Sequence, residues 1–383
     1  MTPPFQRPAL ELAEIVRRHG HRLGDLGGEQ QRILREIASC RTAALGGHVQ
    51  TCDCCHFQRI AYNSCRNRHC PKCQASACAR WMADRAEELL PVEYFHVVFT
   101  LPDAFNAMAL PNKRIVYGVL FDAVARTLSE VAANPKRLGA KIGFIGILHT
   151  WGQNLSLHPH VHCVVPGGGI TADGKWINCK PGFFLPVRVL SKVFRGKFVD
   201  LLKRARDEGK LIGATSADAF DQLLNEAVEH DWVVYAKRPF GGPEQVLKYL
   251  ARYTHRIAIS NRRLVSTNSQ SVTFRWKDYA RRSRQRTMTL DGAEFLRRFL
   301  MHAVPTGFMR IRHFGLLANR VRSQNLELCR RLIGTSARNI PSAAPTPAVD
   351  YCCCPACGHG RLIPGPNLSP LELRPIIRRL DSS

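Results

Sequence analysis

Two histidines that alternate along a short apolar run form the most informative pattern in this sequence. Residues 157–166 read LHPHVHCVVP, and three glycines follow them. If the run is a β-strand, His160 and His162 point to one face while the residue between them packs into the core. Two imidazoles on one rigid face make half of a metal site, although the same spacing also suits a structural pair. A third donor is needed, and we expect Gln153, with His158 as the rival candidate.

Two tyrosines four residues apart form a second pattern. Pro243 and Glu244 are typical of a helix start, so Tyr249 and Tyr253 would share one helical face. Tyrosines at that spacing are usually core residues. These two, however, are surrounded by the cations Lys248, Arg252, His255 and Arg256. Cations suit a phosphate-bearing substrate and favour the phenolate form that a nucleophile requires.

Paired cysteines near the N-terminus predict a structural zinc ion. Two Cys-x-x-Cys knuckles, Cys52 to Cys55 and Cys70 to Cys73, are separated by 14 residues, which is close to the spacing of a zinc ribbon. We expect these four thiolates to form one closed tetrahedral shell with no open position for a substrate. A second ion or a different set of four stays open, because the same stretch contains three spare donors: Cys54, Cys65 and His69.

The C-terminal segment contains one more Cys-x-x-Cys, Cys354 to Cys357. It resembles a further knuckle but lacks a second pair, and Cys352 or His359 is the candidate to complete it. The chain has 15 cysteines, an odd number, and most of them are clustered. Such clustering indicates metal ligation in a reducing compartment better than a disulfide framework.

The charge of the chain predicts a polyanionic partner. Lysine and arginine number 55 against 30 acidic residues, for a formal net charge of +25. Arg66 and Arg68 lie between the expected zinc ligands, where they can contact DNA phosphates. Between Arg262 and Arg286, cations alternate with Phe274, Trp276 and Tyr279. This predicts a groove for single-stranded DNA, with a solvated basic face beside core aromatics as the alternative.

No apolar stretch is long enough to span a membrane, and the first residues lack the apolar core of a secretory signal. We therefore expect no membrane association and a cytoplasmic protein that is associated with the nucleoid.

The elements that must position these residues alternate between helix and strand. We expect helices at 10–16, 30–40, 81–90, 114–133, 189–207 and 244–253. Strands are expected at 94–101, 142–149 and 160–166, with a hairpin of 257–260 and 272–276. The segment 288–334 has a helical and basic pattern, and the prolines of 341–347 indicate a linker. The alternation predicts an α/β or α+β fold.

Taken together, these patterns resemble the rolling-circle insertion-sequence transposases of the two-tyrosine HUH class. The resemblance extends over roughly residues 30 to 335. Its specific phrases occur in order at 62–74, 158–169, 249–256 and 314–320. They correspond to the cysteine stretch, the histidine strand, the tyrosine helix and the run Phe-Gly-Leu-Leu-Ala-Asn-Arg.

The resemblance implies an α+β fold with four consecutive parts. These are a helical zinc-binding and DNA-binding module at 1–91, a catalytic domain at 92–287 with an HUH-type antiparallel sheet flanked by helices, a basic helical region at 288–340, and a linker and tail at 341–383. It also implies that His160, His162 and a third ligand hold Mg²⁺ or Mn²⁺ against the scissile phosphate of single-stranded DNA. Tyr249 or Tyr253 would attack that phosphate and form a 5′-phosphotyrosine, which conserves the bond energy for rejoining.

Two other functions stay open. One is a zinc-ribbon DNA-binding regulator without catalysis, and the other is an HUH replication initiator or relaxase. The chain contains no Gly-x-x-x-x-Gly-Lys-Ser/Thr motif of a helicase, so replication after nicking is expected to depend on host enzymes. The oligomeric state is left open.

Overall fold

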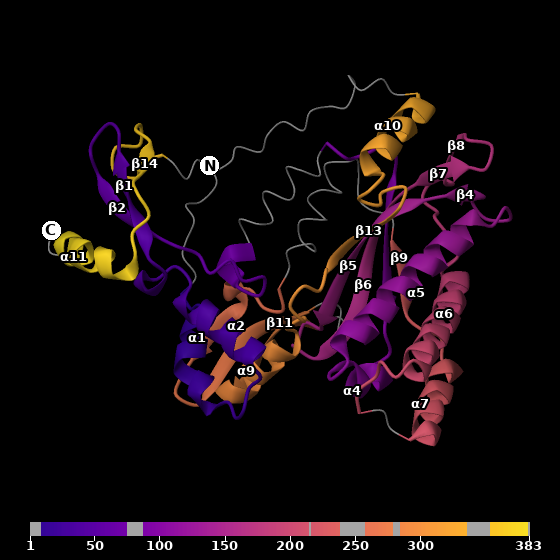
Figure 1. Cartoon of the computed structure of the whole chain (residues 1–383), viewed down its shortest axis with the longest axis horizontal. Coiled ribbons are helices and arrows are strands. Elements are labelled where there is room, and N and C mark those ends of the chain that lie inside the picture. Colours follow the sequence, from indigo (N-terminus) through magenta and orange to yellow (C-terminus); the bar gives the residue numbers. More distant parts are fainter. Residues whose placement is uncertain are drawn as a thin grey trace. The chain divides into compact units, whose positions relative to one another are not determined.

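The computed structural model describes residues 9–74, 87–213, 216–237, 257–278, 284–334 and 353–381, and all statements below concern these ranges (Figure 1). Contacts divide the chain into two units. Unit 1 comprises Met1–Ala77, Ile259–Leu300 and Ser342–Ser383, and unit 2 comprises Cys78–Ala258 and Met301–Pro341. Both units are discontinuous in sequence, which differs from the four consecutive domains expected above. The reason is that two late segments, 259–300 and 342–383, pack with the N-terminal elements.

Unit 2 is built on a five-stranded sheet in which every neighbouring pair is antiparallel. Its strands, in spatial order, are β13 (Ile311–Gly315), β5 (Gly143–Trp151), β6 (Leu157–Pro166), β3 (Tyr94–Thr100) and β9 (Val234–Lys237). Strand β5 is buried along its whole length, as expected for a nearly uninterrupted apolar run in a sheet covered on both faces. The strands expected at 94–101, 142–149 and 160–166 are confirmed as β3, β5 and β6.

Helices cover one face of this sheet through a large aromatic core. They are α4 (Asn106–Ala109), α5 (Lys113–Ala133), α6 (Val187–Asp207) and α7 (Ala217–Glu229). Phe99 of β3 and Phe144 of β5 are fully buried in the same cluster as Phe121 of α5 and Phe194 of α6. The helices expected at 114–133 and 189–207 are therefore confirmed.

The opposite face of the sheet has a smaller core. Because successive strand residues alternate between faces, Ile145 and Ile147 of β5 point away from Phe144. They pack with Leu326 and Cys329 of α10 (Arg322–Ile333). A small sheet in this unit has the order β4 (Ala140–Lys141), β7 (Gly168–Thr171) and β8 (Trp176–Asn178).

Unit 1 combines elements from three parts of the chain. Its helices are α1 (Leu12–His19), α2 (Gly28–Ser39), α9 (Gly292–Met301) and α11 (Pro370–Asp381). One of its sheets has the order β10 (Leu264–Thr267), β11 (Ser271–Asp278) and β12 (Arg284–Asp291), and the other has the order β14 (Leu362–Pro364), β1 (Gly47–Cys52) and β2 (Gln58–Tyr62). The helices expected at 10–16 and 30–40 are confirmed as α1 and α2, with shifted ends.

Two expected features of the later chain differ from the structure. The hairpin predicted from 257–260 and 272–276 is formed by β10 and β11, so its first strand begins at Leu264. The segment 288–334 is mixed and not wholly helical, because it contains the end of β12 and all of β13 beside α9 and α10. The expected helix at 244–253 and most of the one at 81–90 lie outside the described residues.

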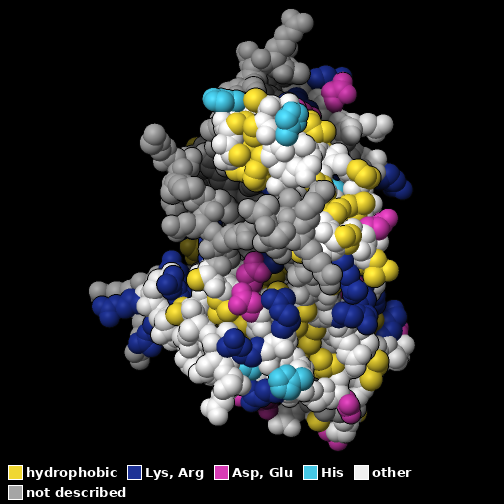
Figure 2. Space-filling model, turned by 90° about the vertical axis from the view of Figure 1, so that its left-hand side faces the viewer, with side chains coloured by type: hydrophobic (Ala, Val, Ile, Leu, Met, Phe, Trp, Pro, Cys, Tyr) yellow, Lys and Arg dark blue, Asp and Glu magenta, His cyan; other side chains and the backbone are white. Residues whose placement is uncertain are grey.

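The surface carries the basic character that the composition predicts. On the face shown in Figure 2, lysine and arginine side chains occur in several groups, and acidic side chains are fewer. None of the helices in the described ranges has an apolar stretch long enough to cross a membrane.

Candidate functional site

Three histidines converge on the face of the unit 2 sheet that carries the smaller core. His160 and His162 lie on β6 and point to the same side, as the strand pattern predicted. Strand β5 places His149 directly opposite His160. Because directly opposed residues of an antiparallel pair share a face, His149 joins the other two. One ring nitrogen from each histidine lies within 4.8 Å of the others, a separation at which one ion can be shared.

Two hydrogen bonds orient the rings of this histidine group. His160 Nδ1 lies 2.6 Å from the carbonyl oxygen of His158, so Nδ1 carries the proton and donates it. The lone pair of the neutral His160 ring is then on Nε2. His162 Nδ1 lies 2.8 Å from His96 Nε2. Such bonds to the second ring nitrogen are how proteins set the tautomer of a metal-binding histidine.

His96 suits the acceptor role in this pair. Burial, reinforced by the charge of Lys237, lowers the pKa of His96 to about 4, so the ring is neutral near pH 7. A neutral His96 can accept the Nδ1 proton of His162, which leaves the lone pair of His162 on Nε2. His96 thus lies behind the group as a positioning residue.

The third histidine of the group is His149, which sequence reasoning missed. Gln153 lies in the turn between β5 and β6, and its expected role as a metal ligand stays a prediction. His158 is outside the group, with its Nδ1 lying 3.5 Å from an Asp103 carboxylate oxygen. A signal for His149 was present, because it ends the apolar run of β5 and an antiparallel turn to β6 brings it opposite His160.

A second buried histidine supports the end of β5. His302 is fully buried, with Nδ1 lying 3.4 Å from Thr150 Oγ1 and Nε2 lying 3.2 Å from the carbonyl oxygen of Leu155. Burial lowers the pKa of His302 to about 3, so this ring is also neutral near pH 7. His302 holds the β5–β6 turn without contributing to the histidine group.

The expected nucleophiles cannot be compared with the structure. Tyr249 and Tyr253 lie between residues 238 and 256, outside the described ranges. The same holds for the cations Lys248, Arg252 and Arg256. Their roles stay predictions.

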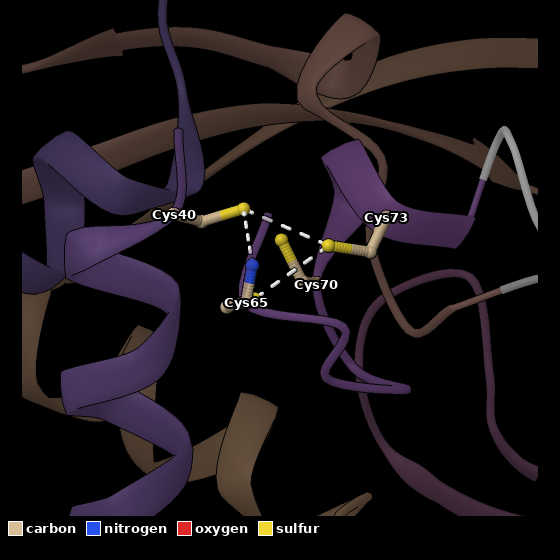
Figure 3. Close-up of side chains that lie close together, drawn as sticks. All are labelled: Cys40, Cys65, Cys70 and Cys73. Atoms are coloured by element: carbon tan, nitrogen blue, oxygen red, sulfur yellow. Dashed lines mark hydrogen bonds between the residues drawn. The ribbon is translucent and has the colours of Figure 1, made fainter. Parts of the chain in front are cut away.

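A group of four cysteines in unit 1 has the geometry of a zinc site (Figure 3). It consists of Cys40 directly after α2, Cys65 in the loop after β2, and Cys70 and Cys73. Cys73 Sγ lies 3.6 Å from the sulfurs of Cys40 and Cys65. In a tetrahedral shell with Zn–S bonds of about 2.3 Å, neighbouring sulfurs lie about 3.8 Å apart. The backbone N–H of Cys65 also donates to Cys40 Sγ, at 3.5 Å.

In the structure, the four cysteines that the spacing had assigned to one zinc ion belong to two separate groups. Cys70 and Cys73 lie with Cys40 and Cys65, whereas Cys52 and Cys55 lie with a pair from the C-terminal segment. The β1–β2 hairpin is the reason. Its paired residues run from Gly47 to Thr51 on β1 and place Cys52 at the turn end, roughly 17 Å from Gly47 at the base. Thiolates at opposite ends of the hairpin cannot share one tetrahedral shell.

The two expected DNA-binding arginines of unit 1 lie beside the first cysteine group. Arg66 is exposed and has a φ of 53°, so it follows Cys65 in a left-handed turn. Arg68 is half-buried. Lys72, in the same stretch, forms an ion pair with Glu11 at 2.5 Å. Arg66 is thus the more accessible of the two expected phosphate contacts.

Strand β11 separates the cations from the aromatics of the predicted groove. Phe274 is fully buried, and Trp276 lies on the same face of the strand. Arg275 and Lys277 are exposed on the other face. A basic solvated face beside core aromatics, the alternative stated above, describes this strand. Tyr279 and two further arginines of the pattern lie outside the described residues.

Comparisons with known proteins give the chain a family. Residues 143–325 match a family described as a putative transposase, Y2_Tnp, and residues 13–101 match a transposase zinc-binding domain of IS91 type. The chain is 51% identical over 381 residues to the putative transposase y4qJ of Sinorhizobium fredii (strain NBRC 101917 / NGR234), covering 93% of this chain and 95% of that protein. It is 29% identical over 342 residues to the transposase for insertion sequence element IS801 of Pseudomonas savastanoi pv. phaseolicola, covering 85% of this chain and 80% of that protein.

Among solved structures, the chain is similar to the conjugative relaxase TrwC in complex with OriT DNA. The copper-bound form is 14% identical, covers 63% of this chain and 71% of its own, and has a TM-score of 0.25. The metal-free form covers 41% of this chain and 70% of its own, with 12% identity and a TM-score of 0.23.

Proposed function

This chain belongs to the IS91-like family of rolling-circle transposases, and from that premise we propose that it cleaves and rejoins single DNA strands at the ends of its element through a 5′-phosphotyrosine intermediate. The observation that carries this proposal is the convergence of His149, His160 and His162 on one face of the sheet. Three imidazoles on two adjacent rigid strands form a preorganised site on the segment that matches the transposase family.

The donor set fits a divalent metal ion. Three neutral imidazole nitrogens within 4.8 Å of one another suit a transition-metal ion better than Mg²⁺, which prefers oxygen ligands, so Mn²⁺ is the better fit of the two ions that we expected. When bound, such an ion supplies Lewis-acid polarisation of a phosphate oxygen. His149, His160 and His162 would hold it. His160 is the most exposed of the three, so the substrate would approach from its side.

The covalent step in our proposal uses one of the two tyrosines. The phenolate oxygen of Tyr249 or Tyr253 attacks the scissile phosphorus, and a bond forms between this oxygen and phosphorus. The bond from phosphorus to the 3′ oxygen breaks, and the leaving oxygen takes a proton as a free 3′-hydroxyl. Attack by a 3′-hydroxyl on the phosphotyrosine reverses these changes and joins two strands without ATP.

DNA is the partner that the charge of the chain favours. A net charge of +25 attracts phosphates through the release of counterions. Arg66 and Arg68 in unit 1 and Lys248, Arg252 and Arg256 near the tyrosines are the contacts that we propose. Host enzymes would supply replication after the nick.

The test is a covalent adduct between the full chain and labelled single-stranded DNA from the element ends, detected as a species resistant to SDS. With Mn²⁺, we expect the wild type to form the adduct and the Tyr249→Phe, Tyr253→Phe double variant to lose it. His149→Ala, His160→Ala and His162→Ala should each lose it while DNA binding is retained. His158→Ala is the matched control, because His158 lies on the same strand as His160 and His162 without belonging to the group.

Three outcomes would contradict parts of this proposal. Unaltered cleavage by His160→Ala would remove the histidine group from the reaction. An adduct in the double tyrosine variant would place the nucleophile elsewhere. Tight DNA binding without an adduct for any end sequence would favour the non-catalytic regulator.

A further inference from the structure

We propose that Cys52, Cys55, Cys354 and Cys357 bind a second structural zinc ion, which fastens the C-terminal segment 353–381 to the β1–β2 hairpin. These four cysteines come from two knuckles about 300 residues apart in the sequence. The match to the transposase zinc-binding domain ends at residue 101, so it covers only half of this ligand set. The site is separate from the group that Cys40, Cys65, Cys70 and Cys73 form within the matched range.

The sulfur positions fit one tetrahedral ion. All four sulfurs lie within 4.8 Å of one another. Cys52 Sγ lies 3.8 Å from Cys357 Sγ, and Cys55 Sγ lies 3.6 Å from Cys354 Sγ. These separations match the value of about 3.8 Å for neighbouring sulfurs in a zinc shell and are far longer than the disulfide bond of about 2.05 Å.

Backbone N–H groups in both knuckles point to the cysteine sulfurs and can stabilise their thiolate form. In the first knuckle, the N–H groups of Cys54 and Cys55 point to Cys52 Sγ at 3.4 and 3.5 Å. In the second, the N–H of Ala356 lies 3.4 Å from Cys354 Sγ. The N–H of Gly360 lies 3.3 Å from Cys357 Sγ. Hydrogen bonds from backbone amides stabilise thiolates, and thiolates are the form in which cysteine binds zinc.

The two knuckles pack too closely for a larger residue between them. A Cβ added to Gly360 would lie 2.5 Å from Cys52 Sγ and 2.6 Å from Cys54 Cβ. On the other side, Asp53 Oδ1 accepts a hydrogen bond from the Arg361 N–H at 2.7 Å. The backbone N–H of Asp53 donates to the Arg361 carbonyl oxygen at 3.1 Å. These contacts hold the N-terminal and C-terminal knuckles together in one site.

The apolar cluster around the four cysteines is small. The hydrophobic cluster at the junction consists of Cys52, Cys354 and Leu362, with Cys357 packed against it. Strand β14 adds three paired residues to the edge of β1. Small domains with so little core usually require disulfides or a metal ion, and zinc binding contributes directly to their folding free energy.

The proposed ligand set differs from both residues that the sequence offered to complete the C-terminal knuckle, Cys352 and His359. His359 is exposed and does not belong to the group. Cys352 lies outside the described residues. The N-terminal knuckle supplies the missing pair instead, so the C-terminal segment is part of unit 1 and is more than a tail.

The first test counts zinc ions per full-length chain in paired variants. Cys52→Ser with Cys55→Ser should lose one zinc relative to the wild type, and so should Cys354→Ser with Cys357→Ser. The quadruple variant should lose the same single ion, because both knuckles share it. Cys54→Ser with Cys353→Ser is the matched control, since these residues are exposed neighbours of the ligands outside the group, and it should keep the full count.

A second test uses the wild-type chain, so it does not depend on whether a variant folds. Cys54 and Cys55 are adjacent and both exposed, but only Cys55 belongs to the group. With an alkylating reagent and peptide mass mapping, Cys54 and Cys353 should react rapidly. Cys55 and Cys357 should react slowly until a zinc chelator is added.

The following results would contradict the proposal of a second zinc ion. A quadruple variant that loses two zinc ions, or none, would contradict the shared site. Equal alkylation rates of Cys54 and Cys55 before chelation would do the same. A disulfide bond between the two knuckles in the freshly purified chain would show that a covalent link, and not a zinc ion, joins them.

Discussion

At the residue scale, the candidate site depends on neutral histidines that are held by burial. His149 and His162 are buried, and His96 lies behind His162 with a pKa of about 4. A protonated imidazole has no lone pair for a metal ion, so burial helps to keep the group competent.

His96 provides a test of positioning at this scale. We expect His96→Phe to raise the Mn²⁺ concentration needed for half-maximal cleavage about 10- to 100-fold, because a residue that orients a metal ligand through a hydrogen bond typically contributes that much to metal affinity. Cleavage at saturating Mn²⁺ should largely recover. His96→Gln, which can still accept a hydrogen bond, should shift the titration less. Identical metal titrations for the wild type and His96→Phe would exclude this role.

His302 predicts a dependence of stability on pH. The pKa of His302 is lowered from 6.5 to about 3 in the folded chain. Between pH 6.5 and pH 3, His302 is therefore protonated in the unfolded chain but neutral in the folded chain. Above pH 6.5 the ring is neutral in both states, so His302 does not lower the free energy of unfolding there. As the pH falls from 6.5 toward 3, protonation of the unfolded chain lowers this free energy by about 1.4 kcal/mol per pH unit. We expect the free energy of unfolding of His302→Gln to fall about 2 kcal/mol less than that of the wild type between pH 6.5 and pH 5. Urea unfolding at both pH values measures this, and parallel decreases would contradict it.

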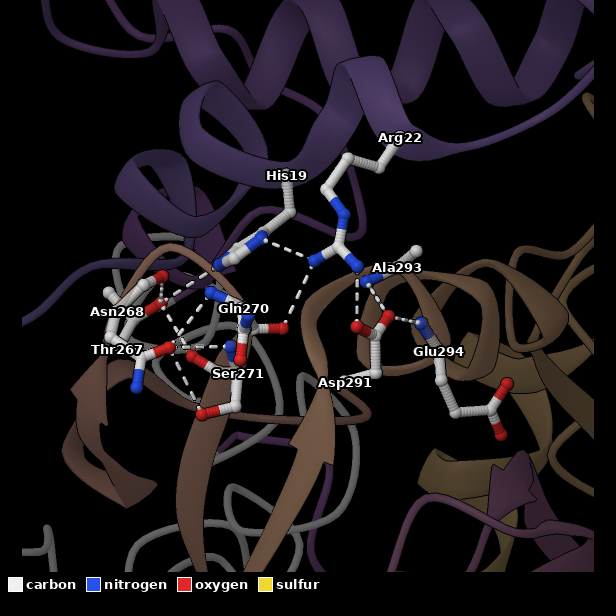
Figure 4. A network of polar contacts seen from close by, with 9 residues as sticks. All are labelled: His19, Arg22, Thr267, Asn268, Gln270, Ser271, Asp291, Ala293 and Glu294. Atoms are coloured by element: carbon white, nitrogen blue, oxygen red, sulfur yellow. Dashed lines mark hydrogen bonds and ion pairs between the residues drawn. The ribbon is translucent and has the colours of Figure 1, made fainter.

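At the element scale, a network of polar contacts joins the end of α1 to β10, β12 and α9 (Figure 4). His19 Nε2 lies 3.1 Å from Thr267 Oγ1, and Arg22 forms an ion pair with Asp291 at 2.6 Å. Asp291 also accepts hydrogen bonds from the first backbone N–H groups of α9. One carboxylate therefore both caps a helix and ties it to an N-terminal element.

Gly292 permits the close approach of these elements. A Cβ at this position would lie 2.2 Å from His19 Nδ1, and the fully buried His19 ring is held by its contacts. We expect Gly292→Ala to destabilise the chain by about 1–3 kcal/mol through overpacking. The matched control is Gly196→Ala on α6, where nothing lies within 4 Å of the new Cβ. Because alanine favours helix, the control should stabilise the chain by about 0.5–1 kcal/mol. Denaturant unfolding of both variants measures the two effects, and equal signs would contradict the packing argument.

At the scale of the whole molecule, the chain consists of two discontinuous units with different candidate metal ligands. Both cysteine groups belong to unit 1, and the histidine group belongs to unit 2. Zinc removal should therefore affect the folding of unit 1, whereas the large aromatic core of unit 2 is independent of thiolate ligands.

We expect two thermal transitions that respond to different changes. A zinc chelator and Gly292→Ala should lower the transition of unit 1. Gly315→Ala should lower that of unit 2, because Gly315 has a φ of 58° and a Cβ there would lie 2.0 Å from the Ile142 carbonyl oxygen. Calorimetry of the full chain, with and without chelator, measures the shifts. A single transition that responds equally to all three changes would contradict two independently stable units.

The chain sequence by itself determines much of unit 2 and its chemistry. Apolar runs with β-branched residues predict β3, β5 and β6, because such segments are stable only when buried in a sheet. The period of two along β6 places His160 and His162 on one face, since that alternation is a property of any strand. The cysteine knuckles likewise indicate zinc, because the spacing of their thiolates is local.

Only the tertiary structure decides which distant residues meet. His149 becomes the third member of its group through the register of β5 against β6, which depends on the turn between them. Cys52 and Cys55 lie apart from Cys70 and Cys73 because a hairpin separates their ends, and they meet Cys354 and Cys357 because β14 pairs with β1. Spacing describes which residues are near in the chain, whereas strand pairing and packing bring together residues that are far apart in it.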